Sequence, residues 1–172
     1  MNRYAFLLLV IKKLEEVGSW TGNTHIQKTA GLVQSITGFK PYKFVMHHYG
    51  PYSFELRDDL NLLVSAGFVE RRTDESGYHY ALTSKGLRFL ENSEIETKIL
   101  GTVDEIANLL GRAPTIVLEL ISTIDYVLNK FGSENEEKVL TTVKMLKPHF
   151  SEEVIMVLSK TIYTKNNNQN HG

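Results

Sequence analysis

The stretch from Tyr49 to Gly86 constrains the fold more than any other part of the chain. It opens with the turn signal Gly50-Pro51, and its apolar residues then recur every three or four positions. That spacing predicts a helix beginning at Tyr52-Ser53. Two β-rich runs flank the turn residues 74–77, and a further helix follows. Helix, two-stranded hairpin and helix are the plan of a winged helix, in which the first helix enters a DNA groove and the hairpin is the wing.

The hairpin of this plan comprises Phe68 to Thr73 and Tyr78 to Leu82. Gly67 ends the helix before it, where glycine adopts a left-handed conformation most easily, and Thr83 caps the helix after it. A further strand is expected at Lys43 to His48, which is rich in aromatic residues. We expect this strand to pair with the hairpin and to complete a three-stranded wing sheet.

The rest of the chain reads as helices, so the predicted fold class is α+β and mostly helical. Residues 1–92 are expected to form an N-terminal winged helix-turn-helix domain. Residues 93–163 are expected to form a helical extension that packs on it or serves for dimerisation. Residues 164–172 have nothing apolar to bury and are predicted to be a disordered tail. The other predicted helices are 3–17, 25–36, 83–92, 95–110, 115–131, 133–146 and 152–163.

Composition excludes several classes of protein. The 172 residues include no cysteine, which removes disulfides, thiolate zinc sites and cysteine nucleophiles and fits a reducing compartment. The apolar run from Tyr4 to Ile11 is too short to span a bilayer, and it continues in register as an amphipathic helix. A cytoplasmic protein that does not enter membranes is therefore expected.

The charge balance excludes a non-specific coat on nucleic acid, because the net charge is −1. Residues 1–92 carry eleven Lys or Arg against nine Asp or Glu, whereas the remaining residues carry eight against eleven. A DNA-binding face needs a local basic patch and does not need a basic protein. The asymmetry has the sign that DNA binding by the N-terminal part requires.

The order of motifs resembles a known family. THIQKTAGLVQ, HHYGPYSFELRDDLNLLVSAGFVE and GYHYALTSKG are similar to the uncharacterised YwgA-type winged-helix proteins of bacteria and archaea. ELISTIDYVLNK and VKMLKPHFSEEVI resemble the C-terminal half of the same family. The chain is more distantly similar to the Panacea antitoxin domain, at Ile26 to Thr29 and at Gly50-Pro51. These resemblances imply the fold and imply no particular activity.

The leading functional prediction is a DNA-binding protein, either a transcriptional regulator or a defence-associated factor, that binds double-stranded DNA. A homodimer is left open as an alternative to packing of the helical extension on the first domain. Phosphate contacts are expected from Lys43, Ser53, Arg57, Arg71 and Arg72, with Lys85 nearby. Asn61 is the expected base reader. Two acids beside Arg57, at positions 58 and 59, oppose a phosphate backbone and weaken this interpretation.

The alternative, from a different class, is an antitoxin-like module that binds a protein partner. Its contact surface is the aromatic turn with Tyr49, Tyr52 and Phe54. Tyrosine and phenylalanine bring large apolar area to interfaces, although such runs more often serve core packing.

Enzymatic activity is not expected, and neither is a cofactor, because no phosphate loop, nucleophile elbow or HExxH spacing occurs. A third and weaker hypothesis is a metal-dependent hydrolase around His47, His48 and Glu55. Adjacent strand residues point to opposite faces, so the two histidines are not expected to chelate one ion together. Glu55 and Asp59 share a helix face at i, i+4 and are able to hold Mg²⁺, although a solvated face is the commoner arrangement.

Overall fold

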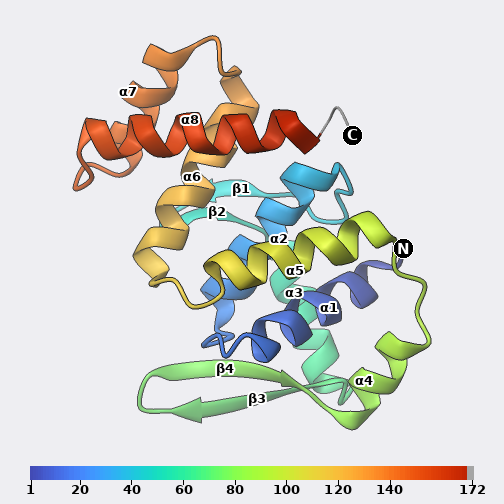
Figure 1. Cartoon of the computed structure of the whole chain (residues 1–172). Helices are drawn as coiled ribbons and strands as arrows, with labels where there is room; N and C mark the ends of the chain where they lie inside the picture. Colours follow the sequence, from blue (N-terminus) through green and yellow to red (C-terminus); the bar gives the residue numbers. More distant parts are fainter. Residues whose placement is uncertain (170–172) are drawn as a thin grey trace.

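The predicted α+β, mostly helical class is confirmed by the computed structural model, which describes residues 1–169 (Figure 1). Two separate antiparallel hairpins accompany the helices. The helices are α1 (Arg3–Glu16), α2 (Asn23–Thr37), α3 (Phe54–Ser65), α4 (Ser84–Glu91), α5 (Thr97–Leu110), α6 (Thr115–Phe131), α7 (Glu136–Leu146) and α8 (Glu152–Gln169). The strands are β1 (Val45–His47), β2 (Gly50–Tyr52), β3 (Val69–Asp74) and β4 (Gly77–Leu82).

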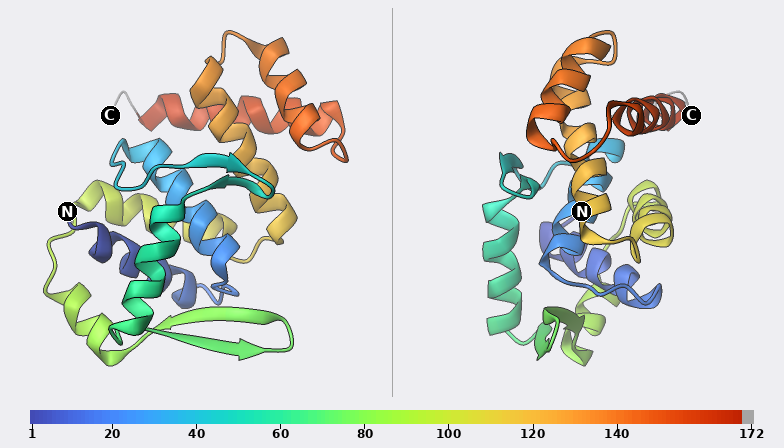
Figure 2. Two further views of the ribbon diagram at one scale, coloured as in Figure 1. Left: turned by 180° about the vertical axis from the view of Figure 1, so that it is seen from behind. Right: turned by 90° about the vertical axis from the view of Figure 1, so that its left-hand side faces the viewer.

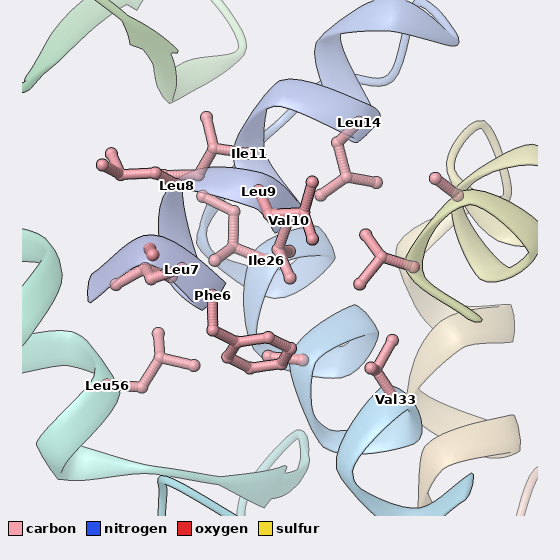
Figure 3. Packing of buried hydrophobic residues seen from close by; sticks show 14 of the residues in the cluster. Phe6, Leu7, Leu8, Leu9, Val10, Ile11, Leu14, Ile26, Val33 and Leu56 are labelled. Atoms are coloured by element: carbon pink, nitrogen blue, oxygen red, sulfur yellow. The ribbon is translucent and has the colours of Figure 1, made fainter. Parts of the chain in front are cut away.

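Helix α1 is the centre of the main hydrophobic core. Every residue from Ala5 to Ile11 is buried, because helices α2, α3, α4 and α5 and strand β4 contact it from several directions. Figure 3 shows this packing, with Phe6 between α1 and α2 and Leu56 reaching in from α3. A helix that is apolar on all sides must be covered on all sides, which explains why this run is the interior of the molecule.

The helix, hairpin and helix predicted in Tyr49 to Gly86 are all present, as α3, β3–β4 and α4. The Ser53 hydroxyl accepts a hydrogen bond from the Leu56 N–H at 3.2 Å and so caps α3. Gly67 has the predicted left-handed conformation, with φ +76°. Thr83 caps α4 by accepting from the Gly86 N–H. Figure 2 (left) shows β1–β2 at one end of α3 and β3–β4 at the other.

The predicted three-stranded wing sheet is wrong. Strand β1 pairs with β2, in the register Val45↔Tyr52, and β3 pairs with β4 in a sheet of its own. The chain reverses at His48–Tyr49, and Gly50 follows in the left-handed region with φ +89°, a conformation that commonly closes short hairpin turns. Gly50-Pro51 therefore belongs to a strand and not to a turn, and β1 finds its partner locally.

A second, smaller core joins the C-terminal half of α6 to α7 and α8. Helix α5 packs into the first core through Ile99, Val103 and Ile106, so the two cores divide within α6 and not near residue 92. Helix α8 continues to Gln169, past the predicted start of the tail at residue 164; residues 170–172 lie outside the described part. Within residues 1–169, no helix combines the length and the apolar character that crossing a lipid bilayer requires.

Candidate functional site

Four aromatic side chains in ring contact line the β1–β2 hairpin and the start of α3, and Tyr49 extends the row at the hairpin tip. The ring of His47 lies 5.5 Å from that of Tyr52 and 5.7 Å from that of Phe54, centroid to centroid, and Tyr52 lies 5.2 Å from Phe54. Tyr49, at the hairpin tip, is 67% exposed, and Phe54 is 44% exposed. We call His47, His48, Tyr49, Tyr52 and Phe54 the aromatic platform. Of the three residues predicted for partner binding, Tyr52 and Phe54 thus lie in ring contact, whereas Tyr49 lies at the hairpin tip.

The backbone under the platform is held from behind by α2. The side-chain amide of Gln27 donates to the Ser53 carbonyl and accepts from the Ser53 N–H, both at 2.9 Å. The Lys28 ammonium donates to the Pro51 carbonyl at 2.7 Å. Both α2 side chains are buried. Because a surface fixed before binding loses less entropy on association, this arrangement suits recognition.

Helix α6 supports the same hairpin from another side (Figure 1). A Cβ at Gly50 would lie 2.8 Å from Thr123 Oγ1 and 3.3 Å from the Glu119 carbonyl oxygen, so only glycine allows this close approach. Burial lowers the pKa of Lys28 to about 8, although the charge of Glu119 opposes the shift. Lys147, which also lowers the pKa of Lys28, pairs with Glu119 at 3.3 Å.

Asp59 lies in the core, not on the exposed face of α3. The Arg3 guanidinium binds both carboxylate oxygens of Asp59, at 2.8 and 2.9 Å, and the Tyr42 hydroxyl donates to Oδ2 at 3.0 Å. Glu55 remains exposed and accepts from the Lys43 N–H. The suggested magnesium site at Glu55 and Asp59 is therefore wrong, because Arg3 and Tyr42 already satisfy Asp59. Desolvation, reinforced by Asp59, raises the pKa of Tyr42.

Ser53 is not available for the phosphate contact predicted for it. Its side chain is fully buried, and its hydroxyl caps α3. Arg57 is exposed and lies over the Phe54 ring at 5.2 Å, but it pairs with Asp58 at 2.8 Å. Asn61, the predicted base reader, is exposed on the same helix.

The remaining predicted cations are spread over different faces and both ends of α3. Arg71 pairs with Tyr80 across the β3–β4 hairpin, and Arg72 pairs with His79, so the two arginines point to opposite faces. Arg72 also forms an ion pair with Glu70. Lys85 donates to the Ala66 carbonyl at the C-terminal end of α3, whereas the Lys43 backbone bonds to Glu55 near the opposite end. The structure does not unite the seven predicted DNA contacts in one patch.

The two histidines proposed for metal chemistry lie in ring contact, with centroids 4.7 Å apart. His48 belongs to the turn, so the expectation that its ring and that of His47 point to opposite faces of a strand is wrong. No group of three or more His, Cys, Asp or Glu side chains in the part of the chain that the structure describes is arranged to hold a metal ion.

No direct sequence signal pointed to the buried polar residues of α2 that organise this region. Gln27, Lys28 and Gln34 interrupt the apolar pattern of α2, and each binds the backbone of a segment that comes later in the chain. Polar residues within an otherwise apolar helix indicate buried hydrogen-bonding groups, and this pattern alone could have revealed that the three side chains bind backbone.

The chain is an α+β protein with a bacterial relative of the YwgA type. It is 29% identical over 149 residues to "Uncharacterized protein YwgA" of Bacillus subtilis (strain 168), across 84% of this chain and 87% of the relative. This similarity supports the YwgA-type resemblance seen in the sequence motifs. No family model matches the chain.

Proposed function

We propose that the chain is a protein-interaction module that binds a partner protein through the aromatic platform. The carrying observation is that the exposed rings of Tyr49 and Phe54 stand on a backbone that Gln27 and Lys28 hold in place. Tyrosine and arginine are enriched among residues that dominate binding energy, and Arg57 lies over the Phe54 ring at the edge of the platform. An antitoxin-like role is one form of this function.

The second candidate function is DNA binding, which the order of elements favours. We propose that α1 to α4 with the β3–β4 hairpin form a winged helix, in which α3 carries the exposed Asn61 and Arg57. Charge argues against this candidate: residues 53–82 contain three arginines, no lysine and six carboxylates. Because a duplex attracts a surface through local positive charge, protein binding is the better supported of the two.

Photo-crosslinking tests the first proposal. With p-benzoylphenylalanine in place of Tyr49, we expect a covalent adduct with one partner protein in cells that make the chain at its natural level. Phe54→Ala in the same chain weakens this adduct at least tenfold, because truncation of an aromatic anchor costs about 2 kcal/mol or more. The same probe at Leu109, 61% exposed on α5, is the matched control. Absence of an adduct at position 49, or equal adducts at both positions, contradicts the proposal.

The DNA candidate is tested with the same variants. Fluorescence anisotropy with fragments of the source genome, at about 50 and 200 mM salt, measures a steep loss of affinity with salt if phosphates are contacted. Salt-dependent binding that Arg57→Ala with Arg71→Ala abolishes, and that Tyr49→Ala leaves unchanged, would favour DNA over protein binding. Binding whose affinity does not change with salt would exclude the DNA-binding candidate.

A further inference from the structure

A cleft of about 790 Å³ opens between α2, the segment 40–44 and α6. Its volume lies within the range typical of small-molecule sites. It is distinct from the aromatic platform, whose rings do not line it, although both use the backbone near Pro51. The lining residues used in the argument below are Lys28, Gly31, Lys40, Phe44, Asp125 and Lys130.

The walls of this cleft are fixed in place by buried polar side chains. Gln34 donates to the Tyr42 carbonyl at 2.9 Å and accepts from the Tyr42 N–H at 3.0 Å, which holds the segment 40–44 against α2. Gln27 holds Ser53 in the same way at the other end. On the opposite wall, Ser35 donates to the Asp125 carboxylate at 3.0 Å. These hydrogen bonds hold the walls of the cleft at a fixed separation.

The charge of the cleft favours an anion. Four lysines and two carboxylates are among its lining residues. The Lys28 side chain is 2% exposed, and its ammonium bonds to one carbonyl oxygen. Lys40 and Lys130 line the cleft and are exposed. Both carboxylates already accept hydrogen bonds, Glu55 from the Lys43 N–H and Asp125 from Ser35. The net excess of about two positive charges matches a phosphate monoester, which carries close to two negative charges at neutral pH.

One wall of the cleft also carries an aromatic side chain. The ring of Phe44 lies against Gly31, where an added Cβ would be 3.3 Å from the ring. The absence of a side chain at Gly31 therefore lets the ring lie close to α2, and Tyr126 lines the cleft from α6. Planar groups stack on such rings, and a flat ligand next to an anionic group would use both features.

We propose that this cleft binds a small organic phosphate with a planar ring, of the mononucleotide class. Lys40 and Lys130 attract the phosphate, Lys28 provides a buried ammonium, and Phe44 faces the ring. This site is independent of partner binding by the aromatic platform, so each proposal can fail without the other.

Calorimetric titration tests the site with adenosine 5′-monophosphate, the other three common ribonucleoside monophosphates, the four parent nucleosides and inorganic phosphate. We expect at least one monophosphate to bind with a Kd below about 1 mM, and its nucleoside to bind at least tenfold more weakly, because hydrogen bonds to charged groups are worth a factor of ten or more. The double variant Lys40→Ala with Lys130→Ala lowers the affinity at least tenfold. The matched control, Arg88→Ala with Lys98→Ala, replaces exposed cations on α4 and α5 and leaves it within about twofold.

Two further measurements keep the proposal falsifiable. Gly31→Ala presses on Phe44, so it weakens the monophosphate more than it weakens inorganic phosphate; its melting temperature shows whether the variant remains folded. Perturbed amide resonances on binding must include Gly31 and Ser35. Failure of all monophosphates to bind at about 5 mM, or equal binding by the lysine double variant and its control, overturns the proposal.

Discussion

The side-chain amide of Gln27 takes the place of a neighbouring strand for Ser53, because it satisfies both the N–H and the carbonyl of that residue at 2.9 Å. Ser53 itself follows β2 and caps α3. One buried side chain on α2 thus fixes the point where the β1–β2 hairpin passes into the helix. The orientation of Tyr52 and Phe54, which flank this point, depends on it.

Gln27→Ala is expected to reduce the free energy of unfolding by about 2–4 kcal/mol, because two buried backbone groups lose their partners. Urea denaturation measures the loss. The variant is also expected to weaken the crosslink at position 49.

Gln34→Ala is the control for this experiment, because Gln34 makes the same pair of bonds to Tyr42. We expect a similar loss of stability with an unchanged crosslink. Unaltered stability and crosslinking in Gln27→Ala would contradict the assigned role.

Gly50→Ala is expected to cost about 2–4 kcal/mol of stability, since it adds steric overlap with Thr123 to the strain of a left-handed alanine. Gly67→Ala isolates the strain, because φ is +76° there and a Cβ would meet no atom within 4 Å; its expected cost is about 1 kcal/mol. Thr123→Ala removes the overlapping hydroxyl, which has no hydrogen-bond partner within residues 1–169. Gly50→Ala therefore costs at least about 1 kcal/mol less in that background. Identical costs in both backgrounds would refute the contact.

Asp59→Asn is expected to destabilise the protein by about 3 kcal/mol, because it leaves Arg3 and Tyr42 without the buried carboxylate that they share. Its neighbour Asp58 supplies the control, since Asp58 pairs with Arg57 on the exposed surface. Asp58→Asn is expected to change stability by less than about 0.5 kcal/mol. Thermal or urea unfolding distinguishes the two variants, and equal effects would place Asp59 outside the core.

Stability is expected to rise between pH 7.5 and 9.5 because of Lys28. Burial lowers its pKa from 10.5 in the unfolded chain to about 8, so the folded protein loses this proton first and the unfolded state binds more protons in that window. The expected gain is about 2 kcal/mol by pH 9.5. The series ends there because burial raises the pKa of Tyr42 and of Tyr80 above the value in the unfolded chain, which lowers stability at still higher pH.

Lys28→Met removes this titration while filling a similar volume. Urea denaturation of the variant is expected to lack the gain over the same pH window. A gain equal to that of the natural chain would assign the effect to another group.

Local signals predicted much of the fold. The cap at Ser53, the left-handed Gly67 and the cap at Thr83 each act within a few residues, so the boundaries of α3 and α4 could be predicted from neighbouring positions. The partner of β1 could not be predicted in the same way. The expected pairing of β1 with β3–β4 involved residues far apart in the sequence. The observed pairing with β2 depends on the left-handed conformation of Gly50, which the residue type alone indicates only weakly.

The candidate site was predictable in part. Tyr52 and Phe54 are two residues apart in the sequence, and their rings are in contact because β2 runs directly into α3. Tyr49 precedes them at the tip of the same hairpin. Asp59 was placed on the wrong face because Arg3, which binds it, lies 56 residues earlier. The divergence of Arg71 from Arg72, by contrast, follows from the two-residue period of a strand alone.

Helix α6 belongs to both cores, with Leu120, Ile124 and Val127 directed to α7 and α8 and with α2 and β2 on its other sides. The last two helices are therefore no detachable appendage. Truncation after residue 131 would expose these three apolar side chains to solvent. It would also weaken the packing of α6, which forms one wall of the cleft and contacts β2 at Gly50. Transfer of α7 and α8 to another protein by recombination would therefore have to include α6. The remaining protein would then lose the helix that supports its β1–β2 hairpin.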